Sequence, residues 1–583
     1  MQNRKEKFVR KDVKILMGAG VFLLLSVLNV GLAFADELDS DVVTITADDI
    51  RAMNVNSITE LLNQTPGVIA GDTSVKLRGS SEVKVFLDGR PINDPLSSHR
   101  AIKWNMVCLN NIEKIEIYKG GGAVDFGDGT SGGAICITTK KIDSSQGKVD
   151  VFFGSMDTRQ YTLNYQHDFS PFGVGFLFDW YETERYRTNY DKQKNQIGLR
   201  GSYKQDEGKN FDLSLDYSTE ERGKPGLEAY PSPNSRAESE VFSASLLGHI
   251  DKIKSSTYFS RCRREDNNPD KNQHTVLRHW TVGENINSSF LVPVVGKINA
   301  GFSFEFAHVE GNKISPKDEQ TYGLKFSKDI RFDAVPLKLG LGVRGNFYSA
   351  FPNVVNPEMK LGYDFYGTDL SFAVSRTNNV PTFLKRYYET SSTQPNPDLG
   401  VEKAYNYSFG VSREFSDSFS VNLSVFLNQM KDRITYVRGD DGIGQYENIG
   451  EVTRKGFESS IDWKVNSWMK FKPSYSYLVA KDDQSGNWLS ARPRHTVKMD
   501  TYFKPMDKLN IVLAVKYVSK QFTRSDNTKS VPEYVIADVR TEYSLGVARA
   551  FLKVENFTDK SYHYGDGYPA PPRRWLVGMS WEF

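Results

Sequence analysis

The sequence has few cysteines and no long apolar run beyond its first 35 residues, and both shortages narrow the class of protein. Cys108, Cys136 and Cys262 cannot form a closed disulfide framework, and no pair has the spacing of a zinc site. Mean hydropathy is −0.48, which excludes a polytopic helical membrane protein, because each helical span needs about 20 mostly apolar residues. We therefore expect isolated packed thiols and no helical membrane domain.

An excess of charge of one sign is also lacking. The chain has 74 basic and 72 acidic residues, a net charge of +2, and residues 1–35 carry +4, which leaves −2 for the remainder. Nucleic-acid-binding domains are usually strongly basic, so we expect no nucleic-acid partner. The eight histidines are scattered and form no evident set of metal ligands. We therefore expect no resident metal ion and no other cofactor.

The N-terminus has the layout of a secretory signal peptide. A basic stretch ends at Lys14, residues 15–35 are almost entirely apolar, and the stretch closes on Ala33-Phe34-Ala35. A basic region, an apolar region and a small-x-small site predict cleavage after Ala35. A retained helical anchor is the alternative, because the apolar stretch is long enough to span a membrane. Either way, the rest of the chain is predicted to cross the inner membrane.

From about residue 147 to Phe583, apolar and polar residues alternate in one segment after another. Residues 211–217, for example, have Phe, Leu, Leu and Tyr at every second position. Successive side chains of a strand point to opposite faces, so each segment has one apolar and one mostly polar face. Many segments reach about ten residues, the length of a membrane-spanning strand, and short and long connections alternate between them. A soluble sandwich does not explain that alternation of connections.

The final segment indicates the same fold. Trp575, Val577, Met579, Trp581 and Phe583 form an alternating apolar row, and the chain ends on the aromatic residue. This ending resembles the C-terminal assembly signal of outer-membrane barrel proteins. We therefore predict an all-β membrane barrel of about 22 antiparallel strands over residues 147–583. It is expected to be a monomer, surrounded by lipid, in the outer membrane of a Gram-negative cell.

Residues 51–146 lack the long alternation and are predicted to form a small α/β domain. Ser57-Ile58-Thr59-Glu60 is a capping box that starts a short helix, and Pro66-Gly67 ends it. A barrel of about 22 strands has a lumen wide enough to need a plug, so this domain is placed in the lumen. Its short strands are expected at residues 75–78, 83–87, 112–118 and 134–139.

Short motifs recur along this domain and the barrel. Those of the domain are at residues 61–68, 77–80, 85–93, 112–120 and 131–140, and those of the barrel are at 378–383, 396–399, 402–403, 448–450, 455–458, 492–495 and 554–560. These motifs resemble those of TonB-dependent outer-membrane receptors, and the resemblance covers nearly the whole mature chain, in order. One departure is that Gly120-Gly121-Gly122 and Asp125-Phe126-Gly127 replace the family's usual turn residues after the strand at residues 112–118.

A short segment near the mature N-terminus resembles the TonB box of this family, most of all that of the cobalamin receptor. Its β-branched residues favour extended backbone, and an extended segment can add a strand to the sheet edge of a partner. The resemblance implies that TonB binds here, within a leader of residues 36–50. A disordered leader or a first strand of the plug is the alternative. The segment consists of Asp41, Val42, Val43, Thr44, Ile45, Thr46 and Ala47.

The resemblance implies energised import of a small-molecule metal chelate, a ferric siderophore in the first place, with cobalamin as the alternative. A passive porin-like channel or an adhesin is the alternative from another class. No enzyme activity is expected: residues 129–133 read G-x-S-x-G, but a strand rather than a helix is expected after them. The candidate ligand contacts, which otherwise belong to solvated loops or an aromatic girdle, are Arg90, Asn93, Asp94, Ser97, His99, Arg386, Tyr387 and Tyr388.

Overall fold

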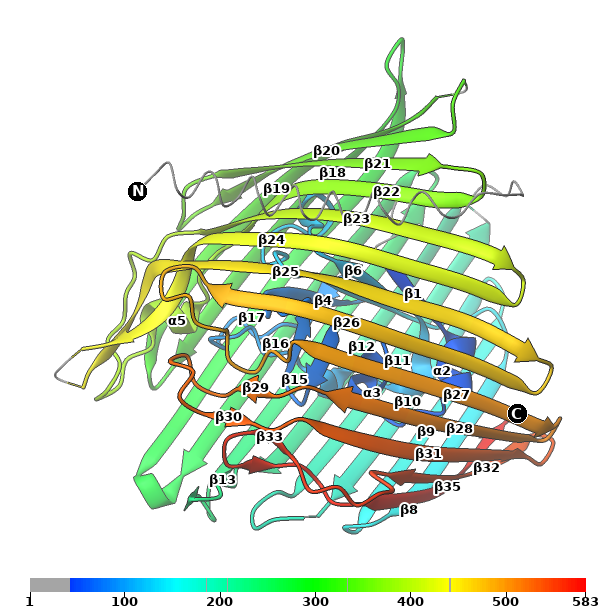
Figure 1. The fold of residues 1–583 in the computed structure, drawn as a ribbon. Helices are drawn as coiled ribbons and strands as arrows, with labels where there is room; N and C mark the ends of the chain where they lie inside the picture. The colour runs from blue at the N-terminus through cyan, green and yellow to red at the C-terminus, as the bar shows by residue number, and fades with distance from the viewer. Residues whose placement is uncertain (1–41, 185, 207, 333, 440–441) are drawn as a thin grey trace.

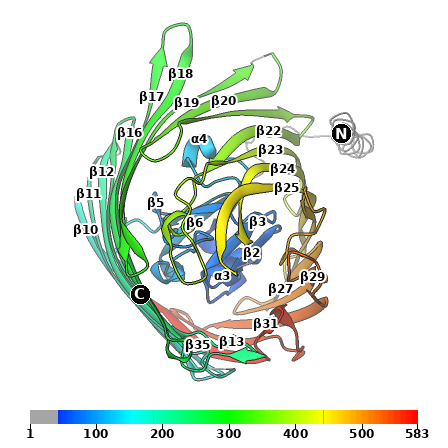
Figure 2. The same ribbon diagram turned by 90° about the vertical axis from the view of Figure 1, so that its left-hand side faces the viewer.

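The computed structural model describes residues 42–583 apart from residues 185, 207, 333, 440 and 441. The predicted signal peptide, its alternative as an anchor, and Asp41 lie outside these residues. A closed barrel of 22 antiparallel strands surrounds a small α/β plug, as the sequence predicts. Figure 1 shows the barrel from the side, and Figure 2 shows the plug elements inside the ring of strands.

The barrel strands pair in chain order, and the last one closes the ring by pairing with the first. The first strand begins at Gln146, one residue before the predicted start of the barrel. The strands are β8 (Gln146–Gly154), β9 (Thr158–Phe169), β10 (Phe172–Thr183), β11 (Lys192–Asp206), β12 (Lys209–Gly223), β15 (Arg236–Ile250), β16 (Ile253–Asn268), β17 (Gln273–Val292), β18 (Gly296–Gly311), β19 (Ile314–Phe332), β20 (Leu337–Tyr348), β21 (Val354–Asp364), β22 (Thr368–Asn379), β23 (Glu402–Ser416), β24 (Phe419–Arg438), β25 (Gly444–Asn466), β26 (Met469–Asp482), β27 (His495–Met506), β28 (Leu509–Val518), β31 (Tyr534–Ser544), β32 (Ala548–Glu555) and β35 (Arg574–Glu582).

The alternation of side chains places an apolar row on the outside of the barrel. On β35, Trp575 and Val577 are 49% and 45% exposed, whereas Leu576 between them is 6% exposed. The predicted outward row of the last strand is therefore present. Among the described residues no helix is long and apolar enough to cross a membrane, a finding that concerns helices alone.

The two ends of the barrel differ in the length of their connections. Short turns join the strands at the end where the C-terminus lies, on the right of Figure 1, and this is the end expected to face the periplasm. The longer extracellular loops contain small elements of their own. These are β13 (Gly226–Leu227), β14 (Tyr230–Pro231), η4 (Pro269–Lys271), α5 (Phe383–Tyr387), β29 (Gln521–Phe522), β30 (Ser530–Val531), β33 (His563–Gly565) and β34 (Tyr568–Pro569).

The plug is built around a five-stranded sheet with the order β1-β6-β7-β4-β5. Strand β4 runs parallel to β7, and the other neighbours are antiparallel. A separate hairpin, β2 with β3, and several short helices cover the sheet. The elements are β1 (Val42–Thr46), α2 (Ala47–Met53), α3 (Ile58–Leu62), β2 (Val68–Gly71), β3 (Ser74–Leu77), β4 (Val83–Leu87), β5 (Arg90–Pro91), η2 (Trp104–Met106), η3 (Leu109–Asn111), β6 (Ile112–Lys119), α4 (Ala123–Phe126) and β7 (Gly133–Thr139).

Helix α3 begins and ends where the sequence predicts. The Ser57 hydroxyl accepts a hydrogen bond from the Glu60 amide, 3.2 Å away. The Glu60 carboxylate accepts from the Asn56 amide at 3.0 Å, one residue before the expected partner. After the helix, Gly67 has a φ of +71°, and a Cβ there would lie 1.7 Å from a carboxylate oxygen of Glu458 on β25. Only glycine therefore fits this close approach of plug to barrel.

Residues 42–46 form a strand of the plug sheet, and the expectation of a leader separate from the plug is wrong. Strand β1 is extended, as predicted, and pairs with β6 from Val42 opposite Tyr118 to Thr46 opposite Lys114. Ile45 is 4% exposed and packs in the plug core. Hydrogen bonding and apolar burial together hold these residues in the sheet. The folded body of the plug thus includes Val42 and extends before residue 51.

Candidate functional site

The structure brings the two predicted parts of the ligand site together. Leu96 lies in the loop of residues 90–100, which we call the apical loop of the plug. It packs in one apolar cluster with Phe383 of α5, and Tyr387 and Tyr388 pack against the same cluster. The loop of residues 386–388 therefore lies beside the apical loop. Leu96 thus packs directly against this loop.

Arg386 is buried and engaged by its own surroundings. Its side chain is 1% exposed and forms an ion pair with Glu319 on β19. The guanidinium also lies over the rings of Phe351 and Tyr387, 4.4 and 4.5 Å from their centroids. Arg90 is similarly buried, with 2% of the residue exposed. Neither arginine is open to an external ligand in this conformation.

The polar residues of the apical loop hold the loop to the barrel and to the plug. Asp94 accepts from Arg264 Nη1 of β16 at 3.0 Å, and its carboxylate lies 3.7 Å from His279 Nε2 of β17. Burial alone would raise the pKa of Asp94, but Arg264, Lys103 and His279 outweigh it and lower the pKa to about 2. Asp94 is thus a charged anchor of the plug.

Two more predicted contacts have structural roles or little access. The Asn93 amide accepts from the Val85 backbone and donates to the Val83 and Arg100 carbonyls. Ser97 is 4% exposed. The predicted residues that keep access to the outside are His99, which is exposed, and Tyr387 and Tyr388, which are half-buried.

A group of cations lies at the extracellular end of the interface between plug and barrel, which we call the seam. We call this group the cationic floor. It consists of Lys76 on β3, Lys385 on α5, Arg433, Arg454 and Arg492.

Two hydrogen bonds within the cationic floor join plug and barrel. Lys76 donates to the Ala491 carbonyl at 3.1 Å, and Arg492 Nε donates to the Gly79 carbonyl at 2.9 Å. Burial and the charge of Arg492 lower the pKa of Lys76 to about 7. Burial and Arg433 lower the pKa of Arg492 to about 10. Like charges are therefore held together here with incomplete neutralisation.

One plug carboxylate, Glu82, lies among these cations. Burial would raise the pKa of Glu82, but Lys385, Arg100, Arg454 and Arg433 lower it. Arg100 is paired with Glu82 and with Asp128, 3.2 Å from each. Glu402, at the start of β23, is the other nearby carboxylate and accepts from Asn379. The floor therefore keeps an excess of positive charge.

Below the floor, asparagines of the barrel wall hold a plug loop. Asn378 donates to Asp128 at 3.0 Å, and Asn379 donates to the Ser131 hydroxyl at 3.0 Å. Asn428 donates to the Ser131 carbonyl at 3.1 Å. Ser131, the serine of the G-x-S-x-G sequence, is 1% exposed and serves as a plug–barrel contact.

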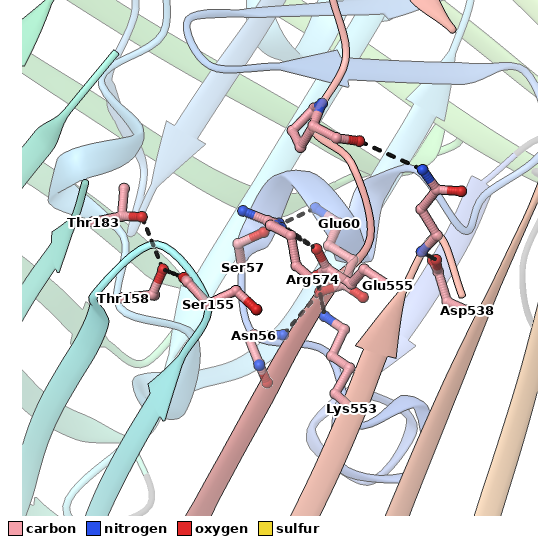
Figure 3. Close-up of polar contacts among 12 residues, drawn as sticks. Asn56, Ser57, Glu60, Ser155, Thr158, Thr183, Asp538, Lys553, Glu555 and Arg574 are labelled. Atoms are coloured by element: carbon pink, nitrogen blue, oxygen red, sulfur yellow. Dashed lines mark hydrogen bonds and ion pairs between the residues drawn. The ribbon is translucent and has the colours of Figure 1, made fainter. Parts of the chain in front are cut away.

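Charged residues anchor the other side of the plug to the barrel wall. Glu60 on α3 lies 2.6 Å from Lys553 Nζ of β32 and 2.7 Å from Arg540 Nη2 of β31. Lys553 also pairs with Glu555, which accepts from Arg574 Nε of β35 at 2.7 Å. Figure 3 shows Glu60 on the plug beside Lys553, Glu555 and Arg574 from the barrel. Paired in this way, the charges avoid most of the cost of burial.

A second anchor uses residues of the plug and barrel motifs. Glu458 on β25 accepts from Lys119 Nζ at 2.9 Å and lies 3.4 Å from Arg78 Nη2. All three side chains are at most 6% exposed. The plug is therefore fixed by ion pairs on more than one side of the lumen.

The sequence did not reveal the cationic floor as a site. Its residues come from positions 76 to 492 and are brought together only by the barrel and the plug. Arg492 belongs to the motif at residues 492–495, which was its one signal. In the part of the chain that the structure describes, no group of three or more His, Cys, Asp and Glu side chains is arranged to hold a metal ion.

Comparison with known proteins identifies the family. Residues 119–557 match the family described as TonB dependent receptor-like, beta-barrel, and residues 35–134 match the TonB-dependent receptor plug domain. The chain is 22% identical to the vitamin B12 transporter BtuB of Vibrio vulnificus, over 94% of this chain and 93% of that protein. It is 23% identical to an iron-regulated outer membrane virulence protein of Vibrio cholerae, over 92% of each.

Solved structures share the fold. The siderophore receptor PirA of Acinetobacter baumannii superposes with a TM-score of 0.80 at 16% identity, over 93% of this chain and 98% of that one. The ferric enterobactin receptor PfeA of Pseudomonas aeruginosa gives a TM-score of 0.79, also at 16% identity and with the same coverage. With the matches to the barrel and plug families, the chain is a TonB-dependent receptor of the outer membrane.

Proposed function

We propose that this receptor imports an anionic metal chelate, a ferric siderophore in the first place, using energy transmitted through TonB. The observation that carries the proposal is the cationic floor at the extracellular end of the plug–barrel interface, where Arg492 lies beside both Lys76 and Arg433. Cations that repel one another in a partly buried site are stabilised by an anion. Arginine in particular can donate two parallel hydrogen bonds to an oxyanion.

The printed names of the relatives support two cargo classes. Two solved neighbours are named as receptors for a siderophore or ferric enterobactin, and one relative is named as a vitamin B12 transporter. The excess of positive charge in the floor favours the more strongly anionic ferric chelate. Cobalamin is the second candidate, on the strength of the name of that relative.

The plug also supports energised import over a passive channel. Anchors at Glu60 and Glu458 hold it across the lumen, so cargo passes only if the plug moves. We propose that TonB pulls on the N-terminal part of the plug. If residues 42–46 are the TonB box, β1 must first leave β6. It is positioned for this, because it is the edge strand of the sheet.

Uptake by cells tests this function. Cells whose only such receptor is this one are given radiolabelled iron as an anionic ferric catecholate, or radiolabelled cyanocobalamin, with and without TonB. The proposal expects TonB-dependent accumulation of iron. Accumulation of cobalamin alone would show that cobalamin, and not the ferric chelate, is the cargo. Equal uptake without TonB would contradict energised import.

A further inference from the structure

A second cationic site lies at the other end of the seam, where the plug meets the periplasmic mouth of the barrel. An open cavity of about 250 Å³ lies between helix α2 of the plug and the short turn that joins β25 to β26. Asp49 and Met53 line it from the plug. Trp468 and Tyr502 line it from the barrel, together with four lysines. We call this cavity the exit pocket.

The four lysines of the exit pocket come from three adjacent strands. They are Lys464 on β25, Lys470 and Lys472 on β26, and Lys504 on β27. Lys464 lies opposite Lys470 in the β25–β26 pair, so these two like charges are held on neighbouring strands. Directly opposed like charges on a sheet are unfavourable.

Carboxylates pair with three of the four lysines, and Lys504 lies 3.9 Å from Asp507. Asp462 pairs with both Lys470 and Lys472, at 2.8 and 3.3 Å. Asp49 accepts hydrogen bonds from the backbone and the hydroxyl of Thr46, at 3.0 and 2.8 Å, as the cap of α2. Within the described residues Lys464 forms no ion pair. Lys464 therefore leaves one positive charge in the exit pocket that is not paired with a carboxylate among the described residues.

Two further lysines lie on the wall above the pocket, accompanied by Asp500 on β27 and Asp538 on β31. Lys498 on β27 lies opposite Lys516 on β28, and both are inward-facing positions. Lys498 donates to the Thr65 carbonyl of the plug at 2.7 Å. Lysines thus face the lumen from four adjacent strands, although Lys498 and Lys516 lie toward the extracellular ends of β27 and β28.

We propose that the exit pocket is a binding site for an oxyanion group, and that it receives the anionic cargo as it leaves the lumen. The role in transport rests on the proposed function, but the site itself rests on the pocket's own geometry. Lysine ammonium groups bind oxyanions as mobile point charges, and Trp468 and Tyr502 line the cavity on its barrel side. A cationic site at each end of the seam would draw an anion from one to the other.

Equilibrium dialysis with radiolabelled inorganic pyrophosphate tests the site on the purified full chain at low salt. The parent protein carries Arg433→Gln and Arg492→Gln, which weaken binding at the cationic floor. We expect this parent still to bind pyrophosphate, and Lys464→Gln with Lys470→Gln to weaken that binding at least tenfold. Lys464→Arg with Lys470→Arg should retain it. Lys508→Gln, on the neighbouring short turn, is the matched control and should leave binding unchanged.

Two results would overturn the site: no pyrophosphate binding by the parent, or equal binding by the Lys464→Gln/Lys470→Gln variant. These results are distinct from a failure of the proposed function. If cells import no anionic chelate but pyrophosphate binding depends on Lys464 and Lys470, the transport role falls and the site stands. If cells import the anionic chelate but pyrophosphate binding does not depend on Lys464 and Lys470, the exit pocket is not an oxyanion site and the proposed import function stands.

Discussion

Lys76 of the plug and Arg492 of the loop between β26 and β27 lie together as like charges, although they are more than 400 positions apart in the sequence. The Lys76 ammonium donates to the carbonyl of Ala491, the residue before Arg492, at 3.1 Å. Plug and barrel thus contribute one cation each to a single site. An anion bound there would contact both domains, so its affinity would depend on how the plug and the barrel are placed relative to each other.

This relationship predicts a pH dependence of ligand affinity. Burial and Arg492 lower the pKa of Lys76 to about 7, and a bound anion would raise it. Anion binding therefore takes up a proton above pH 7, and affinity should increase by up to about tenfold as the pH falls from 8 to 6. Titration calorimetry with a chelate that does not itself titrate in this range measures the change.

The matched variant is Lys76→Met, which keeps the length of the side chain and removes the charge. It should bind more weakly at pH 6 and show little change of affinity between pH 6 and 8. A pH dependence that persists in Lys76→Met would assign the proton uptake to another group.

The ion pairs of Glu60 predict that the plug depends on this carboxylate. Glu60→Gln keeps the shape but removes the plug carboxylate that pairs with Arg540 and Lys553; Arg540 keeps its hydrogen bond to the Met53 carbonyl. Removing one member of a buried network costs about 3–5 kcal/mol, so helix α3 should open more often. Hydrogen exchange of the α3 amides in the purified protein measures this opening.

Asp48→Asn is the control for that experiment. The Asp48 side chain is 89% exposed and pairs with Arg51 in α2 of the same domain. Its loss should leave the exchange of α3 unchanged, and the barrel should assemble normally in both variants. Equal protection of α3 in Glu60→Gln and wild type would show that the network does not hold the helix.

The placement of β1 changes the expected effect of Val43→Pro. Proline removes a backbone donor, and Val43 lies opposite Ile117 inside the plug sheet. The variant should lose hydrogen-exchange protection along β1 and β6 and should stop importing cargo. Binding at the cationic floor should persist, because Lys76 and Arg492 lie outside this strand pair. Thr44→Val, at an exposed position of β1, should behave as wild type; full import by Val43→Pro would contradict a coupling role.

Much of the fold was predictable because it follows from local patterns. Alternation and connection lengths predicted the barrel, and the plug strand at residues 83–87 has the observed bounds. Residues 42–46 were predicted to be extended, but their partner was not. A run of β-branched residues has the same signature in a free segment and in an edge strand, and only β6, some 70 residues later, distinguishes them.

The site was less predictable than the fold. The apical loop and residues 386–388 do meet, yet Arg386 is used for internal packing on Phe351 and Tyr387. Residue type alone did not separate an arginine that supports a loop from one that faces a ligand. Conversely, Lys76 lies in an ordinary plug strand, and its role follows only from the proximity of Arg492.

The outward row of β35 predicts a position that does not tolerate charge. Val577 is 45% exposed on the outer face, so Val577→Arg should destabilise the barrel by about 2–4 kcal/mol if it lies near the bilayer midplane. Unfolding in lipid vesicles, followed by the loss of heat-resistant migration, measures the effect. Val577→Leu is the control. Wild-type stability of Val577→Arg would place this residue outside the hydrocarbon region.

The most direct test of the account is the affinity of the purified receptor for an anionic ferric catecholate and for cyanocobalamin, with and without the cationic floor. The account predicts that wild type binds the ferric chelate more tightly and that Arg433→Gln with Arg492→Gln weakens this binding about 30-fold, roughly 2 kcal/mol. Arg261→Gln, an exposed position on β16, should leave it unchanged. Unaltered affinity for the ferric chelate in the double variant, or tighter binding of cyanocobalamin by wild type, would contradict the proposed cargo.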